Sequence, residues 1–301
     1  MRLAHLLARS EGNGLRSLSA AEIEALGAAY RQLMSDLAIA RRDFPDDQLT
    51  ASLNALAARA HLRFYRAPAG SWRGLGRFFT VEFARRLRAA GGYLLVAALL
   101  LLVPAAWAYV SALHSETLRA ALVPPQLRAV MERGQTWTDL PPAARPAMAA
   151  LIFTNNIRVS FFAFAGGVLF GAGTAYVLVA NGLFIGAVLG AAQWYGVGLA
   201  LGAFVSPHGY LELTLVVIAG AAGLMLGDAL LRPGLRRRRD ALTLAGRRSL
   251  ALALGAAPLF VLAGLIEGLV SPSGLPAEIK LALGPLVWAS VMAGLLWLGR
   301  A

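Results

Sequence analysis

Six apolar stretches, each close to the length of a membrane-crossing helix, constrain this chain more than any other feature. A helix needs about 20 apolar residues to cross the hydrocarbon core of a bilayer, at a rise of about 1.5 Å per residue. The stretches run over residues 91–113, 159–180, 183–205, 210–231, 250–270 and 281–298. Only 15% of the residues are charged, whereas soluble domains carry about 25%. The sequence therefore predicts an all-α, polytopic membrane protein with about six transmembrane helices.

Short polar segments separate most of the apolar stretches. Only Asn181-Gly182 lies between the second and third stretches, so these two residues are predicted to form a tight hairpin. Residues 206–209 and 271–276 are predicted to form two further short loops. The segment 114–150 contains two Pro-Pro pairs and is predicted to be the one sizeable external loop. The transmembrane domain is thus expected over residues 91–301.

Residues 1–90 are predicted to form a cytosolic helical module. Ser19 and Glu22 have the spacing of a capping box, which opens a helix. That helix carries apolar residues on one face, at Leu26, Tyr30, Leu33 and Leu37. It is expected to end near Phe44-Pro45, since proline disfavours a helical residue before it. A second helix from residue 46 or 47 completes an antiparallel pair.

An arginine-rich segment with interspersed aromatic residues ends this module, directly before the first apolar stretch. It is predicted to be a helix in the membrane interface, with its arginines on anionic lipid headgroups. The alternative is an ordinary positive-inside anchor without lipid specificity. The predicted headgroup contacts are Arg73, Arg77, Arg85, Arg86 and Arg88.

Arginine placement also predicts the orientation and argues against nucleic acid as a partner. The net charge is +12, but the arginines flank apolar spans, as topology signals do. A second arginine cluster lies over residues 232–248. Both clusters are expected in the cytoplasm, and six spans satisfy this requirement. The sequence predicts a multi-pass protein of the bacterial inner membrane with both termini cytoplasmic.

Glycines recur at intervals of four residues within the central apolar stretches. This spacing lets helix backbones approach closely, within one chain or in a homodimer. A glycine-lined substrate path is the other interpretation. The predicted packing residues are Gly167, Gly171, Gly182, Gly186, Gly190, Gly223 and Gly227.

A set of polar residues falls inside or at the ends of the apolar stretches, and the predicted topology places all of them near the outer membrane face. They are Asn155, Asn156, Arg158, His208, Glu212 and Glu267. His208 and Glu212 are four residues apart and share a helix face. Ionisable groups within spans are usually paired and often functional. Three uses are open: a structural network in which Arg158 neutralises Glu212 or Glu267, a metal site, or a proton or ion relay.

The metal hypothesis takes His208, Glu212 and Glu267 as candidate ligands, with a position left for water as in catalytic zinc sites. No other cofactor is predicted. The chain has no cysteine, which removes disulfides and thiolate chemistry. No phosphate loop, nucleophile elbow or dinucleotide fingerprint is present in the sequence. A soluble-type active site is therefore not expected.

An ordered set of motifs resembles the stage II sporulation protein M family of integral membrane proteins. The motifs are Asn155-Asn156, the glycine-rich residues 166–174, Asn181-Gly182, residues 207–212 (PHGxxE) and residues 266–268 (IEG). The resemblance covers most of the chain. It implies a membrane component of an engulfment or envelope-remodelling complex with cell-wall partners, in some relatives encoded near MoxR-type ATPases.

Two functional hypotheses follow from these observations. The first is a non-catalytic inner-membrane scaffold of a cell-envelope remodelling complex, dimeric through its glycine-rich faces, with the lipid bilayer, cell-wall proteins and a MoxR-type ATPase system as partners. The second is a transporter, a lipid scramblase or an intramembrane metal-dependent hydrolase that uses the polar residues near the outer face.

Overall fold

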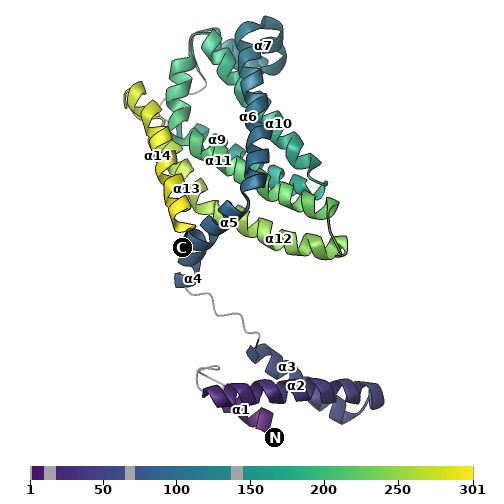
Figure 1. The fold of residues 1–301 in the computed structure, drawn as a ribbon. Coiled ribbons are helices and arrows are strands. Elements are labelled where there is room, and N and C mark those ends of the chain that lie inside the picture. The colour runs from purple at the N-terminus through teal and green to yellow at the C-terminus, as the bar shows by residue number, and fades with distance from the viewer. Residues whose placement is uncertain (1, 10–17, 65–71, 137–144, 301) are drawn as a thin grey trace. The chain divides into compact units, whose positions relative to one another are not determined.

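The computed structural model describes residues 2–9, 18–64, 72–136 and 145–300. Every regular element in these ranges is a helix, and no strand occurs among them (Figure 1). The all-α prediction is therefore confirmed. The chain divides into two compact units, Met1–Trp72 and Arg73–Ala301, and each has its own core. Residues 10–17, 65–71 and 137–144 lie outside the described residues, and the last of these ranges is part of the predicted external loop.

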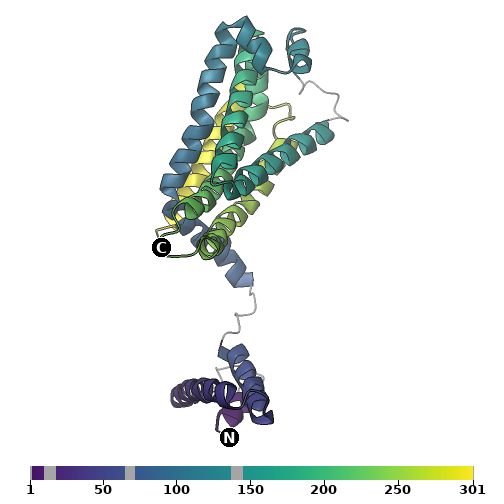
Figure 2. The same cartoon turned by 90° about the vertical axis from the view of Figure 1, so that its right-hand side faces the viewer.

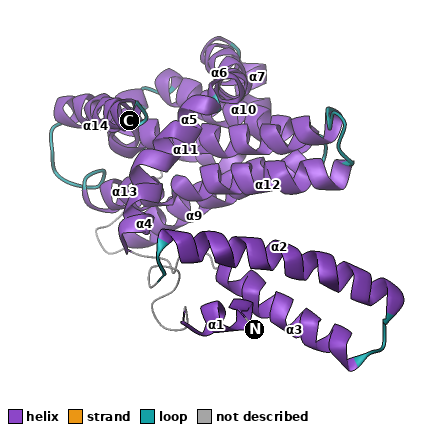
Figure 3. Cartoon of the chain, turned by 60° about the horizontal axis from the view of Figure 1, so that its bottom comes forward, coloured by secondary structure: helices purple, strands orange, loops and turns teal. Residues whose placement is uncertain are grey.

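The first unit is a small helical module. Its helices are α1 (Arg2–Arg9), α2 (Ala20–Asp43) and α3 (Gln48–Phe64). Figure 3 shows α2 and α3 side by side, joined by the short turn after Phe44. The predicted capping box is confirmed, because the Glu22 amide donates to the Ser19 hydroxyl and the Ser19 amide donates to the Glu22 carboxylate. The Ser19 amide is the main reason that the pKa of Glu22 lies below its usual value.

The apolar face predicted for α2 forms the core of this unit. Leu26, Leu33 and Leu37 are buried, while Tyr30 packs at the edge of the same cluster. Across from them lie Ala57 and Ala60 of α3. Packing of this apolar stripe stabilises the helix pair, since short isolated helices are marginal in water.

The second unit contains the membrane-spanning part. Its long helices are α6 (Gly91–His114), α9 (Arg145–Ala165), α10 (Ala172–Trp194), α11 (Gly198–Leu231), α12 (Arg238–Gly255), α13 (Ala257–Leu269) and α14 (Ala277–Leu298). Two short helices, α7 (Glu116–Leu122) and α8 (Pro125–Met131), follow α6 within the predicted external loop. The described residues hold six segments long and apolar enough to cross a membrane, the fifth being α12 and α13 together. The predicted number of spans is confirmed.

The predicted turn at Asn181-Gly182 is wrong, because both residues lie in the interior of α10. The real turn between α9 and α10 follows the short 3-10 helix Gly166–Val168, and it uses left-handed backbone at Phe170 and Gly171. Within hydrocarbon a helix satisfies every backbone group internally. Gly182 therefore serves close packing inside a continuous helix rather than chain reversal.

The predicted loop at residues 206–209 is also wrong. These residues lie within α11, whose 34 residues include Pro207. Chain reversal occurs earlier, between α10 and α11, where Gly196 has a φ of +76°. A proline inside a helix removes one backbone donor, and neighbouring helices make this tolerable in a membrane protein. The polar residues His208 and Glu212 are consequently in the middle of a helix rather than at its start.

Glycines of α10 pack directly on the backbone of α6, and the two helices lie side by side (Figure 2). A Cβ on Gly182, Gly186 or Gly190 would fall on a carbonyl oxygen of α6. Where the turn before α10 meets α11, Gly167 and Gly223 lie against each other in the same way, and a Cβ on Gly227 would fall on the backbone of Gly171. A Cβ on Gly171 itself would make an ordinary contact with Gly227, at 3.7 Å. All seven glycine positions singled out from the sequence thus lie in contacts within one chain.

The arginine-rich segment packs as part of the second unit. It forms α4 (Trp72–Arg77), a short π-helix (Phe78–Glu82) and α5 (Phe83–Ala89). Phe83 and Leu87 of α5 are buried in a core cluster with Leu252 of α12 and Leu295 of α14. The segment from Arg73 onward therefore packs with the membrane-spanning helices. The boundary predicted from the sequence between the two domains lies later, at residue 90.

The arginines of this segment point mostly to the surface. Arg77, Arg85 and Arg88 are exposed. Arg86 is half-buried, and its Nη2 lies 4.0 Å from Oε2 of Glu82. Arg73 lies in α4. Contact of these side chains with lipid headgroups stays a prediction.

Candidate functional site

The candidate site is built around two side chains of α11. His208 and Glu212 are four residues apart, so they project from the same helix face. Both are buried, with exposed fractions of 2% and 4%. His208 Nε2 lies 3.9 Å from Glu212 Oε2, which is longer than a hydrogen bond. The helix therefore brings an imidazole and a carboxylate together without joining them directly.

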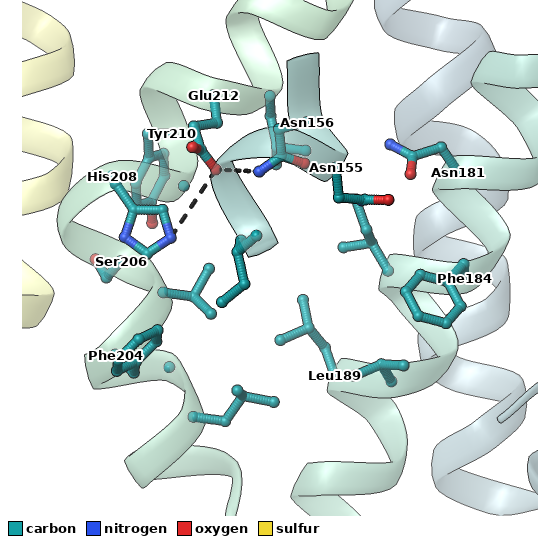
Figure 4. Close-up of a pocket in the computed structure, with 18 of the residues that line it drawn as sticks. Asn155, Asn156, Asn181, Phe184, Leu189, Phe204, Ser206, His208, Tyr210 and Glu212 are labelled. Atoms are coloured by element: carbon teal, nitrogen blue, oxygen red, sulfur yellow. Dashed lines mark hydrogen bonds and ion pairs between the residues drawn. The ribbon is translucent and has the colours of Figure 1, made fainter. Parts of the chain in front are cut away.

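Asn156 of α9 holds the Glu212 carboxylate. Its Nδ2 donates to Oε2 of Glu212 across 2.5 Å (Figure 4). The other carboxylate oxygen, Oε1, is buried and has no hydrogen-bond partner among the described residues. A buried acceptor without a donor is costly. Glu212 therefore retains an unused acceptor inside the protein.

His208 is tied to the loop that follows α13. Its Nδ1 lies 2.8 Å from Oγ of Ser271, at hydrogen-bond distance. That loop is held in turn by Lys280 of α14, whose Nζ donates to the carbonyl oxygens of Ser271 and Ser273 at 2.8 and 2.6 Å. This chain of contacts fixes the orientation of the imidazole ring relative to Glu212.

Glu267, near the end of α13, is the third acidic element of the site. Its side chain is fully buried, and both carboxylate oxygens lack a hydrogen-bond partner in the described part of the chain. It interacts electrostatically with Glu212. Two carboxylates close together in an apolar interior require a proton or a cation between them, because their mutual repulsion is weakly screened there.

Beside Glu212 lies a cavity of about 650 Å³. Its walls come mainly from α9, α10 and α11 and are mostly aliphatic and aromatic. The polar side chains that line it are Asn155, Asn156, Asn181, Ser206, His208, Tyr210 and Glu212. Ligand pockets are typically about 300–1,000 Å³, largely apolar, with a few placed polar groups. The cavity has the size and the character of such a pocket.

Two of the six polar residues predicted from the sequence lie away from the buried centre of the site. Arg158 is exposed, and no ion pair joins it to Glu212 or Glu267 within the described residues. Asn155 is also exposed, although it lines the cavity. Of the other four, His208, Glu212 and Glu267 are buried and Asn156 is half-buried, and all four lie within helices. Neutralisation of the glutamates by Arg158 therefore has no geometric support.

The proposed metal ligands do not form a metal-holding group in this arrangement. Among the described residues no set of three or more His, Cys, Asp and Glu side chains is placed to hold a metal ion. The three candidate ligands instead make the contacts described above, with an amide, a hydroxyl and each other. The site therefore offers two buried carboxyl groups and one imidazole rather than a set of metal ligands.

Sequence reasoning missed several residues of this site. Asn181 lines the cavity, and its Nδ2 is buried without a hydrogen-bond partner among the described residues. It was assigned to a hairpin because Asn-Gly resembles a turn. Ser271 and Lys280 were missed because their contacts to His208 and to the 271–273 backbone come from distant parts of the chain.

A second polar contact lies at the opposite end of α11. Tyr93 Oη donates to Asp228 Oδ2 across 2.6 Å, and Arg232 Nε donates to Asp228 Oδ1 across 2.6 Å. Asp228 and Arg232 thus form an ion pair. This network links α6 to α11, which is a structural role.

Comparison with known proteins gives a consistent family assignment. The family model described as "Stage II sporulation protein M" matches residues 93–272, more than half of the chain. A second model, described as a domain of unknown function (DUF8413), matches residues 1–66. An uncharacterized protein of Methanocaldococcus jannaschii is 31% identical over 123 residues, covering 40% of this chain and 69% of the relative. No solved structure matches the chain significantly.

Proposed function

The chain belongs to the Stage II sporulation protein M family, and from that premise we propose that it is a non-catalytic membrane scaffold of a cell-envelope remodelling complex. Its second unit anchors it in the bilayer, and its first unit recruits a partner. The partner classes are those that the family resemblance implies: cell-wall proteins and a MoxR-type ATPase system.

One observation carries this proposal: the chain combines a membrane-spanning unit with a separate helical unit that has its own core. The first unit exposes large apolar side chains around the turn between α2 and α3. Ile39, Phe44 and Leu49 have exposed fractions of 49%, 59% and 56%. Exposed apolar residues that cluster on a small domain are typical of protein interaction sites.

The orientation proposed for the scaffold follows the arginines. Those of α4 and α5 and those between residues 232 and 239 are mostly exposed, and the positive-inside rule assigns such residues to the cytoplasm. We propose an inner-membrane protein with both termini cytoplasmic, so that the first unit meets cytoplasmic partners. A homodimer would require a surface other than the seven packing glycines, because those positions are occupied within one chain.

The test is affinity purification of the full-length protein from native membranes into nanodiscs, followed by mass spectrometry. The expected result is stoichiometric recovery of cell-wall enzymes or of a neighbouring ATPase. A triple variant, Ile39→Ser, Phe44→Ser and Leu49→Ser, should lose that recovery. A matched control, Glu24→Ser with Gln48→Ser on the same two helices, should keep it. Recovery of the protein alone from both preparations would overturn the scaffold proposal.

A second candidate function is supported by the cavity. The pocket of about 650 Å³ lies beside a buried carboxylate, and an ionisable residue within a membrane-spanning segment is by default a functional-site hypothesis. We propose, as the alternative, a transporter, scramblase or intramembrane hydrolase that works through His208, Glu212 and Glu267. If Glu267→Gln and His208→Ala give folded proteins that have lost a measurable flux or reaction, this candidate replaces the scaffold. If they only lower thermal stability, the scaffold stands.

A further inference from the structure

The cavity beside Glu212 has a marked charge asymmetry. Glu212 is the one acidic residue among its lining residues, and no arginine or lysine lines it in the described structure. Oε2 of Glu212 accepts from Asn156, whereas Oε1 is buried and has no donor. Glu267, which is not among the lining residues, is a second buried carboxyl group that interacts electrostatically with Glu212. The site therefore favours a cationic group and disfavours an anionic one.

The cavity is also divided into a polar and an apolar end. In Figure 4 the side chains of Asn155, Asn156, His208 and Glu212 gather at one end. Leu189 and Phe204 lie at the other end, among further aliphatic residues of the walls. An elongated ligand with one polar head and a hydrocarbon chain matches this division.

We propose that the cavity binds an amphiphile from the bilayer that carries an ammonium head group. The ammonium lies at the carboxylate of Glu212, near the amide of Asn155, while the hydrocarbon chain lies against Leu189 and Phe204. An ammonium offers up to three donors and a compact positive charge. Burying an acid and a cation together is far less costly than burying the acid alone.

A bilayer source is favoured over a small water-soluble amine. Most of the cavity wall is apolar, so a ligand without a hydrocarbon chain would leave that surface unfilled. Burial of the chain adds favourable free energy in proportion to its apolar area. The cavity also lies among segments long and apolar enough to span a membrane, where amphiphiles are concentrated.

This inference names the ligand class of the cavity on which the second candidate function rests, but it requires binding only. Binding without any flux would support the inference and count against transport. Flux without selectivity for an ammonium head would support transport and count against the inference. The two ideas can therefore fail separately.

The experiment compares three probes with the same twelve-carbon chain: dodecylamine, dodecanol and dodecanoate. Each is added to the full-length protein in phosphatidylcholine nanodiscs, and bound molecules are counted by native mass spectrometry. Dodecylamine should bind about tenfold more tightly than dodecanol, because a hydrogen bond to a charged group contributes about that factor. Dodecanoate should bind least. Ethylamine, which has the same head without the chain, should not bind measurably.

Two variants and a control assign the binding to this site. Glu212→Gln should reduce dodecylamine affinity by about tenfold and leave dodecanol binding unchanged. Leu189→Trp, which fills part of the cavity, should weaken both. Glu278→Gln, at an exposed position in the first turn of α14, should change neither.

Several results would overturn the proposal. Equal affinity for the three probes would remove the head-group preference, and this comparison needs no variant, so it holds even if Glu212→Gln fails to fold. Undiminished dodecylamine binding in a folded Glu212→Gln protein would place the ligand elsewhere. Ethylamine binding as tight as dodecylamine binding would rule out a bilayer amphiphile as the ligand.

Discussion

Gly186 of α10 lies so close to α6 that a Cβ added to it would fall on the carbonyl oxygen of Ala105. This contact is the middle one of three, which recur every four residues along both helices. The two outer contacts are between Gly182 and Leu101 and between Gly190 and Tyr109. Because each of these glycines faces backbone atoms of α6, a side chain at any of the three positions would force the helices apart.

Gly186→Ala is therefore expected to destabilise the protein. Overpacking of a close contact costs about 1–3 kcal/mol, and this exceeds the gain of about 1 kcal/mol from replacing glycine by alanine in a helix. The control is Gly294→Ala in α14, where an added Cβ meets nothing within 4 Å. Thermal unfolding in detergent should show a lower Tm for the first variant only. Equal Tm values would mean that α6 and α10 are not packed as described.

Asn156→Leu is expected to destabilise the protein by removing the donor to Glu212. Leaving a buried acceptor without its partner costs about 1–3 kcal/mol, and more for a charged one. The control is Asn155→Leu, the neighbouring exposed residue, for which the described structure gives no hydrogen bond. Chemical denaturation in mixed micelles should distinguish them. If both variants unfold at the same denaturant concentration, the hydrogen bond contributes nothing to stability.

Tyr93→Phe should weaken the link between α6 and α11. The variant deletes the hydroxyl that donates to Asp228 across 2.6 Å, and a hydrogen bond to a charged group contributes about 1.5–3 kcal/mol. Tyr109→Phe is the matched control in the same helix, since no hydrogen bond is described for that hydroxyl. Hydrogen exchange at the end of α11 should be faster in the first variant and unchanged in the second.

Ser19→Ala is expected to loosen the start of α2 without affecting the membrane unit. Loss of a capping hydroxyl should speed amide exchange in the first turn of α2 by about fivefold. Ser35→Ala, an exposed position within the same helix, should have little effect. Since the pKa of Glu22 is lowered in the folded protein, its stabilising contribution is present at neutral pH and is lost as the pH falls through that lowered value.

Membrane orientation can be tested with single cysteines, because the chain contains none. Leu235→Cys lies in the exposed arginine-rich segment between α11 and α12. Gly274→Cys lies in the exposed loop between α13 and α14. A membrane-impermeant maleimide should label the second in intact cells and the first only after permeabilisation. The opposite pattern would reverse the proposed orientation.

Much of the fold was predictable from local patterns. The length and apolarity of the spans, the capping box at Ser19 and the end of α2 at Phe44 all depend on residues close together in the chain. The turns were less predictable. Asn181-Gly182 and residues 206–209 have turn-like composition, but both lie inside helices. In a membrane bundle, small and helix-breaking residues also serve helix packing, so composition does not distinguish the two uses.

The candidate site was predicted only in part. Charged and polar residues within apolar stretches are conspicuous in a sequence, and this identified His208, Glu212, Glu267 and Asn156. Their mutual contacts were not predictable. The hydrogen bond from Asn156 to Glu212 joins residues 56 positions apart, and the contact between His208 and Ser271 joins residues 63 apart. No local pattern encodes such separations.

The sequence by itself determined that this protein is helical, that it has six segments long and apolar enough to cross a membrane, and that it belongs to its family. Hydrophobic length and motif order are properties of the chain read in one dimension. Only the tertiary structure decided which glycines meet which backbone, that Arg158 lies apart from the buried glutamates, and that a cavity opens beside Glu212. These features depend on how helices distant in the chain pack together, and packing is decided by the whole set of contacts at once.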